Sequence, residues 1–138
     1  MTAIDFYTRV GDRLQVAARI AAKAFARRCR VRVLTADASM TEALDRALWV
    51  QPATSFLPHC RLDDRLAAET AIWIDHRLEH AGAASVLINL HSDPPPFFAR
   101  FERLAEIVDE ASAAAARQRY RYYRERGYEL RTHDLGAA

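Results

Sequence analysis

The side chains with the clearest chemical potential lie near the end of the chain, in the run from Arg117 to Gly127. On a helix that turns about 100° per residue, Arg117, Arg121 and Arg124 fall on one stripe, and Tyr120 flanks it. Guanidinium groups bind carboxylates in a two-pronged manner, and aromatic rings add apolar contact at low entropic cost. The pattern therefore suits an acidic peptide with a hydrophobic anchor, or a phosphate backbone with stacked bases.

A second unusual segment, residues 47–59, reads Ala-Leu-Trp-Val-Gln-Pro-Ala-Thr-Ser-Phe-Leu-Pro-His. Trp49 and Phe56 stand among Pro52 and Pro58, outside any regular alternation. Exposed together, the two rings would form an aromatic patch of the kind found at protein interfaces. Each segment also has a plainer interpretation, in which the aromatic rings complete the hydrophobic core and the arginines of the last segment face water.

Familiar enzyme and cofactor motifs are missing from the sequence. The turn after the first predicted strand holds Gly11 alone, where a dinucleotide-binding fingerprint needs three glycines. There is no phosphate-binding loop and no serine nucleophile elbow. His76, His80 and His91 are the nearest approach to a metal site, and they lack a settled arrangement. We expect no catalytic residues, no cofactor and no metal.

Length and composition favour one globular domain. The 138 residues are 51% hydrophobic and 28% charged, as in ordinary globular proteins. No apolar run approaches the roughly 20 residues of a membrane-spanning helix, and the first residues do not resemble a signal peptide. Cys29 and Cys60 lack metal-binding or redox spacing, so we expect a cytoplasmic protein with reduced thiols. The formal net charge of +2 is too small to indicate nucleic-acid binding by itself.

The hydrophobic pattern predicts alternating strands and helices. Strand-like runs occur at 4–8, 31–35, 71–74, 86–90 and 106–109, with an edge strand at 128–130. Helices are predicted at 11–28, 39–49 and 97–103, with a last helix from 111 or 112 to 127 and a loop at 51–69. Ser39 and Glu42 have the spacing of a capping box. This order predicts an α/β fold, a single Rossmann-like domain with a mostly parallel sheet, helices on both faces and a disordered tail at the last few residues.

Together, the two segments resemble the chi subunit of bacterial DNA polymerase III, an accessory protein of the clamp-loader assembly. The family has a similar Ala-Leu-Trp, Pro, Ser-Phe and Pro-His stretch after its second helix, and a similar R-x-R-Y-x-x-Y-R-x-x-G ending. This chain has both in the same order. Asp5-Phe6-Tyr7 also looks like the family's first strand, and the likeness covers nearly the whole chain, most loosely at 60–100.

The resemblance implies a non-catalytic accessory subunit of the polymerase III holoenzyme in DNA replication. Chi proteins bind the acidic C-terminal tail of single-stranded DNA-binding protein, and they bind the psi subunit, which tethers them to the clamp loader. Arg117 and Tyr120 match family positions of the tail pocket, and the helical stripe adds Arg121 and Arg124. Ala113 departs from the pattern, because a relative can place a basic residue one turn before Arg117.

For the psi contact, the candidates are Trp49, Pro52, Phe56 and Pro58. Contact with single-stranded DNA is expected to be mostly indirect, and no membrane contact is expected. Two other classes remain open at this point. One is a module that binds single-stranded DNA directly through the same Arg/Tyr helix, with a steep dependence on salt. The other is a divergent α/β enzyme with a deep polar pocket.

Overall fold

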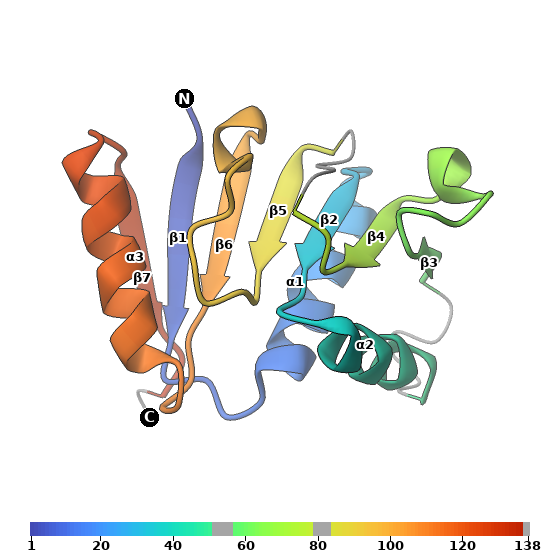
Figure 1. Ribbon diagram of the computed structural model, residues 1–138, viewed down its shortest axis with the longest axis horizontal. Coiled ribbons are helices and arrows are strands. Elements are labelled where there is room, and N and C mark those ends of the chain that lie inside the picture. The colour runs from blue at the N-terminus through green and yellow to red at the C-terminus, as the bar shows by residue number, and fades with distance from the viewer. Residues whose placement is uncertain (51–56, 79–83, 137–138) are drawn as a thin grey trace.

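The computed structural model describes residues 1–50, 57–78 and 84–136. In this part of the chain a seven-stranded sheet has the order β3-β4-β2-β5-β6-β1-β7 (Figure 1). The strands are β1 (Ala3–Thr8), β2 (Val31–Leu34), β3 (His59–Cys60), β4 (Ile72–Asp75), β5 (Val86–Asn89), β6 (Arg103–Ile107) and β7 (Leu130–Asp134). The α-helices are α1 (Arg13–Ala26), α2 (Ala38–Val50) and α3 (Ala113–Glu125), with short 3-10 turns η1 (Ala67–Glu69) and η2 (Phe98–Arg100). All neighbouring strands pair in parallel.

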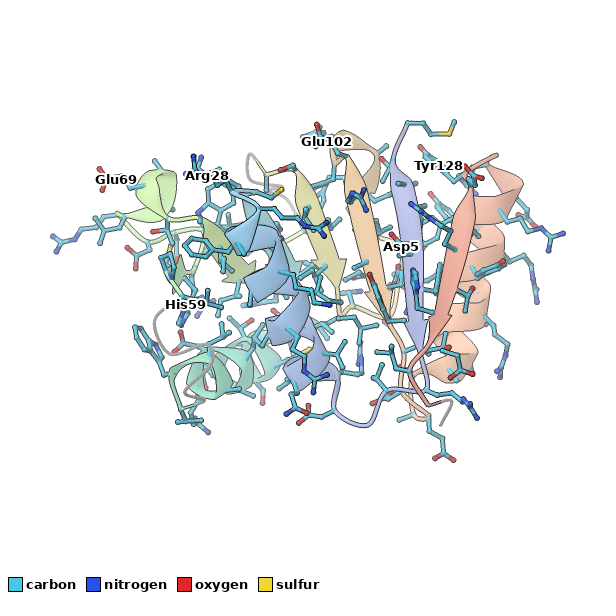
Figure 2. The ribbon with its side chains drawn as sticks, turned by 180° about the vertical axis from the view of Figure 1, so that it is seen from behind. Asp5, Arg28, His59, Glu69, Glu102 and Tyr128 are labelled. Atoms are coloured by element: carbon cyan, nitrogen blue, oxygen red, sulfur yellow. The ribbon has the colours of Figure 1, made fainter. Side chains whose placement is uncertain are left out.

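Alternating side chains along the strands build two hydrophobic cores, one on each face of the sheet. Ile72, Ile74 and Ile88 belong to the core that α1 and α2 cover. Phe6 and Leu104 belong to the other core, which α3 and the segment around η2 cover. Figure 1 shows α3 in front of the sheet, and Figure 2, seen from behind, shows α1 across the opposite face. The predicted α/β fold with helices on both faces is confirmed.

Several local predictions need correction. The capping box at Ser39 and Glu42 is wrong, because α2 already begins at Ala38 and the Asp37 carboxylate accepts the hydrogen bond from the Met40 N–H at 2.8 Å. Asp37 is therefore the residue that satisfies a free amide at this helix start. The predicted helix at 97–103 shrinks to η2, so β6 starts three residues before the strand expected at 106–109. The predicted loop at 51–69 contains β3 and η1.

The turn between β1 and α1 does not resemble a nucleotide-binding loop. The Asp12 carboxylate accepts hydrogen bonds from the Leu14 and Gln15 N–H groups, at 3.0 and 3.2 Å. In dinucleotide-binding folds the pyrophosphate occupies this helix N-terminus. A carboxylate already fixed there repels a phosphate, which agrees with the missing glycines of the sequence.

The order of the strands brings distant parts of the chain together at the side of the sheet where the strands end. β1 lies between β6 and β7, and Phe6 pairs with Glu106 on one side and Thr132 on the other. The strands end together at the lower edge of the sheet in Figure 1, where α3 begins and the described chain ends. Loops after parallel strands gather at such an edge, and ligand sites of open α/β sheets lie there.

Candidate functional site

A groove of about 650 Å³ lies at this edge, between α3 and the ends of β1, β6 and β7. Arg117 and Tyr120 of α3, both predicted from the sequence, line it together. The apolar part of its lining comes from Phe6, Val10, Val108, Ala113 and Ala116. Ala113, the position at which the sequence departs from the expected family pattern, contributes to an apolar wall. The groove thus combines an apolar floor, a phenol ring and a guanidinium.

The tyrosine of the groove is held by aromatic packing. The rings of Tyr120 and Phe6 meet edge to face, with centroids 5.2 Å apart. This is the preferred geometry of aromatic pairs. Phe6 is buried in β1 and therefore has a fixed position. Its contact holds the half-buried ring of Tyr120 in place at the groove.

The groove also contains charged groups of both signs. Arg117 is exposed and forms no ion pair within the described residues. Arg9, Asp109 and Glu110 are the other charged side chains of the lining. The Asp109 carboxylate accepts hydrogen bonds from Ser112 N and Oγ, at 2.9 and 2.7 Å. Burial raises the pKa of Asp109, but the Ser112 hydrogen bonds and the Arg13 charge outweigh this effect and lower the pKa below its ordinary value.

The remaining members of the predicted stripe lie outside the groove. Arg121 and Arg124 are exposed on α3 but do not belong to the lining. Their guanidinium groups lie on the same helix as Arg117. They therefore add positive potential near the groove but do not form part of its wall. The structure therefore brings Arg117 and Tyr120 together and leaves Arg121 and Arg124 beside them.

The inner face of α3 carries a buried polar network that the sequence reasoning missed. The Glu106 carboxylate on β6 accepts hydrogen bonds from Arg119 Nε at 3.0 Å and Tyr123 OH at 2.6 Å. Asn89 Nδ2 also donates to both carboxylate oxygens, at 3.0 Å each. Arg119 Nη1 donates to the Ser92 carbonyl at 2.8 Å. Burial, and then the negative charge of Glu106, raise the pKa of Tyr123.

This network fixes the rotation of α3 on the sheet. Arg119 and Tyr123 are one helical turn apart, so both reach the same carboxylate beneath the helix. A buried charge without its partner is costly, which makes other rotations of the helix unfavourable. With this face turned inward, Arg117 and Tyr120 turn toward the groove. The spacing of Arg119 and Tyr123, together with a glutamate inside an apolar strand, was a usable signal in the sequence.

A second surface lies at the other end of the sheet, around α2 and β3. Trp49 is 57% exposed, and its ring contacts the His59 ring at a centroid distance of 4.7 Å. His59 Nδ1 contacts the Leu57 carbonyl at 2.8 Å, and Nε2 lies 3.1 Å from Asp45 Oδ1. Trp49 and His59 both line a hollow of about 460 Å³. Figure 2 shows His59 beside α2.

The other residues of the predicted aromatic segment have different positions. Pro58 is exposed between the buried Leu57 and β3. Pro52 and Phe56 lie outside the described residues. Of the predicted residues, the structure describes Trp49 and Pro58, so the patch of Trp49 with Phe56 stays a prediction. His59 is a neighbour of Trp49 that the prediction omitted.

Within the described ranges, no three histidine, cysteine, aspartate or glutamate side chains are grouped as a metal site requires. His80, one of the three histidines considered from the sequence, lies outside those ranges. Among the same residues, no helix has the length and apolar character needed to cross a bilayer.

Comparisons with known proteins agree with the sequence motifs. The family model described as "DNA polymerase III chi subunit, HolC" matches residues 1–131. The DNA polymerase III subunit chi of Pseudomonas aeruginosa is 36% identical, over 98% of this chain and 98% of the relative. The protein of the same description from Escherichia coli (strain K12) is 31% identical, over 86% of this chain and 82% of the relative. The chain belongs to the DNA polymerase III chi subunit family.

Proposed function

We propose that this protein is a non-catalytic adaptor of the DNA polymerase III holoenzyme, which joins the clamp loader to DNA-coating protein. One end binds the acidic C-terminal tail of single-stranded DNA-binding protein, and the other binds the psi subunit. Family membership supports a role within the polymerase assembly. The observation that carries the tail assignment is the shared groove of Arg117 and Tyr120 over an apolar floor. The adaptor acts in the cytoplasm, at the replication fork.

The groove fits the chemistry of such a tail. A chain that ends in a carboxylate after an apolar residue needs a cation next to an apolar surface. Arg117 supplies the two-pronged guanidinium, and Tyr120 with Val108 and Ala116 supplies the surface. Arg121 and Arg124 attract the acidic residues farther along the tail, because exposed charges act over about 10 Å at moderate ionic strength. The tail binds without a large rearrangement, since the ring of Tyr120 is already packed.

The psi subunit binds at the α2 surface. Exposed tryptophan is enriched at the centres of protein interfaces, and Trp49 stands at the wall of the hollow there. Pro58 directly precedes His59, a residue of its lining, and Pro52 and Phe56 belong to the same stretch of sequence. The two sites lie at opposite ends of the sheet, so both partners can be bound at once (Figure 1). Once one partner is bound, the adaptor holds the other partner nearby. This raises the effective concentration for the second binding event, so two modest contacts suffice.

A fluorescence titration tests the tail site. A labelled acidic peptide ending in Asp-Ile-Pro-Phe is titrated with the wild-type protein and with Arg117→Ala. We expect a dissociation constant on the order of 1 μM for the wild type, and about tenfold weaker binding for the variant, because a charged hydrogen bond is lost. Arg19→Ala, an exposed arginine of α1, is the matched control and should bind normally. Binding should weaken in 0.5 M salt.

The same experiment separates the adaptor from a direct DNA binder. An unlabelled single-stranded oligonucleotide is added as competitor and titrated alone. Absence of peptide binding, with tight and strongly salt-dependent oligonucleotide binding, would replace the adaptor by a DNA-binding module.

Co-elution with psi on a sizing column tests the second site. Trp49→Ala should abolish the complex, because truncation of an interface tryptophan commonly costs 2 kcal/mol or more, on the order of 30-fold in affinity. Leu66→Ala is the matched control. Leu66 is 52% exposed, similar to Trp49, and it lies outside the lining of the hollow. Loss of psi in both variants, or in neither, would place the psi contact elsewhere.

A further inference from the structure

Arg9 is an unusual residue at the rim of the groove. It directly follows β1, and its backbone is left-handed, with φ at 54°. Residues other than glycine avoid this region because Cβ crowds the backbone. The few that adopt it cluster at functional sites. Asn or Gly would fill this turn at lower cost. An arginine at this position is therefore a candidate for a role of its side chain, and its contacts decide whether it has one.

The end of the chain is built around this side chain. Arg9 Nε donates to Asp134 Oδ1 at 2.8 Å. The Leu135 N–H donates to the Thr8 carbonyl at 3.0 Å, which ties the turn after β7 to the end of β1. Gly136 then passes so closely that an added Cβ would lie 2.8 Å from Arg9 Cβ. The contacts hold the arginine in one place although its side chain is 63% exposed.

The ion pair alone does not account for this arrangement. Exposed ion pairs stabilise proteins little or not at all, whereas a left-handed arginine carries a steric cost. The hydrogen bond with Asp134 uses Nε, and no described residue accepts from either Nη group of Arg9. The two outer amino groups of the fork remain available for a ligand.

The charge of the groove also favours a role for a second cation in binding an acidic ligand. Arg117, Asp109 and Glu110 alone would give the lining an excess of negative charge, which disfavours an acidic ligand. With Arg9, which is also paired with Asp134, the lining holds two guanidiniums beside its two carboxylates. Arg9 stands on the sheet side of the groove, whereas Arg117 stands on the helix side. A peptide lying between them meets a guanidinium on each side.

We propose that Arg9 is a second carboxylate-binding residue of the groove, and that the turn Asp134–Gly136 positions it. This inference rests on the proposed function of the groove, and names a ligand with at least two carboxylates, one for each guanidinium. Arg117 binds one carboxylate from the helix side, and Arg9 binds another from the sheet side. The side chain of Arg9 thereby discriminates in favour of peptides with more than one negative charge.

The test uses Arg9→Gly in the full-length protein. Glycine accepts the left-handed backbone, so the guanidinium is removed without new strain. Arg28→Gly is the matched control, because Arg28 is the other non-glycine residue with positive φ among the described residues, at 62°. Figure 2 shows Arg28 at the end of α1 away from the edge where the strands finish. Both variants lose one positive charge from an exposed position.

The probe is the labelled Asp-Ile-Pro-Phe peptide, with its C-terminal amide as a second probe of lower charge. We expect Arg9→Gly to weaken binding of the free acid about fivefold to tenfold and to reduce its salt dependence, with Arg28→Gly unchanged. Gly136→Ala keeps every charge and should weaken binding by a smaller factor, by displacing Arg9. The wild-type preference for the free acid over the amide should shrink in Arg9→Gly or in Arg117→Ala, because one of the two arginines faces the C-terminal carboxylate.

Each outcome has a distinct meaning. Normal binding by Arg9→Gly, with binding lost in Arg117→Ala, overturns the role of Arg9 and leaves the proposed function intact. Equal weakening in Arg9→Gly and Arg28→Gly reduces the effect to net charge and also overturns it. No peptide binding by the folded wild-type protein, judged by a cooperative thermal melt, overturns both proposals together.

Discussion

Two faces of α3 use the same residue types in opposite ways. On the inner face, Arg119 is 1% exposed and Tyr123 fully buried, and both bind the Glu106 carboxylate. On the groove face, Arg117 is exposed and Tyr120 half-buried, and the arginine has no ion-pair partner among the described residues. The inner pair has its partner inside the molecule, and the outer pair is free to take one from outside.

The difference teaches how a binding helix can be both rigid and available. A buried charge resists any rotation of the helix that would remove its partner, and Glu106 has Arg119 and Tyr123 as partners on α3. That resistance lets the neighbouring arginine stay exposed without losing its position. We therefore expect substitutions on the inner face to change stability, and substitutions on the groove face to change binding.

The largest expected effect is on stability. Arg119→Ala leaves Glu106 buried without its guanidinium, and should reduce the free energy of unfolding by about 3–5 kcal/mol. Arg117→Ala should change it by no more than about 0.5 kcal/mol, as for most surface substitutions. Urea unfolding followed by circular dichroism measures both. A similar loss in the two variants would show that the faces are not distinct.

The next effect is a dependence of stability on alkaline pH. Burial and the Glu106 charge raise the pKa of Tyr123 above its ordinary value, so the folded protein keeps a proton that the unfolded chain loses near pH 10. Stability therefore falls as pH rises, by about 1.4 kcal/mol per pH unit above that point. Urea unfolding at pH 9, 10 and 11 should show a shallower decline for Tyr123→Phe. Identical declines would mean that Tyr123 does not titrate differently on folding.

A smaller effect concerns the acidic side of the groove. Glu110→Gln removes an exposed carboxylate from the lining and should strengthen binding of an acidic peptide about twofold to threefold at low salt, in line with the strength of exposed charge pairs. The gain should fade in 0.5 M salt. Peptide titration at two salt concentrations measures it, and weaker binding in the variant would contradict the charge assignment of the groove.

The smallest effect separates the groove from the rest of the stripe. Arg124→Ala removes a cation outside the lining, so peptide affinity should fall by about twofold or less. Arg121→Ala should behave in the same way. A loss as large as that of Arg117→Ala would mean that the peptide runs along the exposed face of α3 and not into the groove.

Much of the fold could be predicted because its signals are local. Strand alternation at 4–8 and 86–90 and the apolar spacing of α1 follow from which side chains can face a core. The two-residue strand β3 is too short to show alternation, and it exists because the edge of β4 was available for pairing. Asp37 and Ser39 are both good capping residues, and the choice depended on where the backbone after β2 turned.

The site was predictable only in part. Arg117 and Tyr120 are close in sequence, so a helical wheel places them near one surface, and the resemblance to chi subunits singled them out. Arg9 is separated from them by most of the chain, and its place in the groove depends on β1 lying beside β6 and β7. The assignment of Trp49, Pro52, Phe56 and Pro58 to psi stays a prediction.

The sequence by itself determined the α/β class, the helical character of the last segment and the chi-family motifs, because these depend on spacing along the chain. It could fix the angles between Arg117, Arg119 and Tyr120 around a helix, but not the rotation of that helix on the sheet. The tertiary structure decided that rotation, since Glu106 of β6 lies beneath α3 and binds Arg119 and Tyr123. Non-local strand pairing likewise decided that Arg9 and Arg117 share one groove.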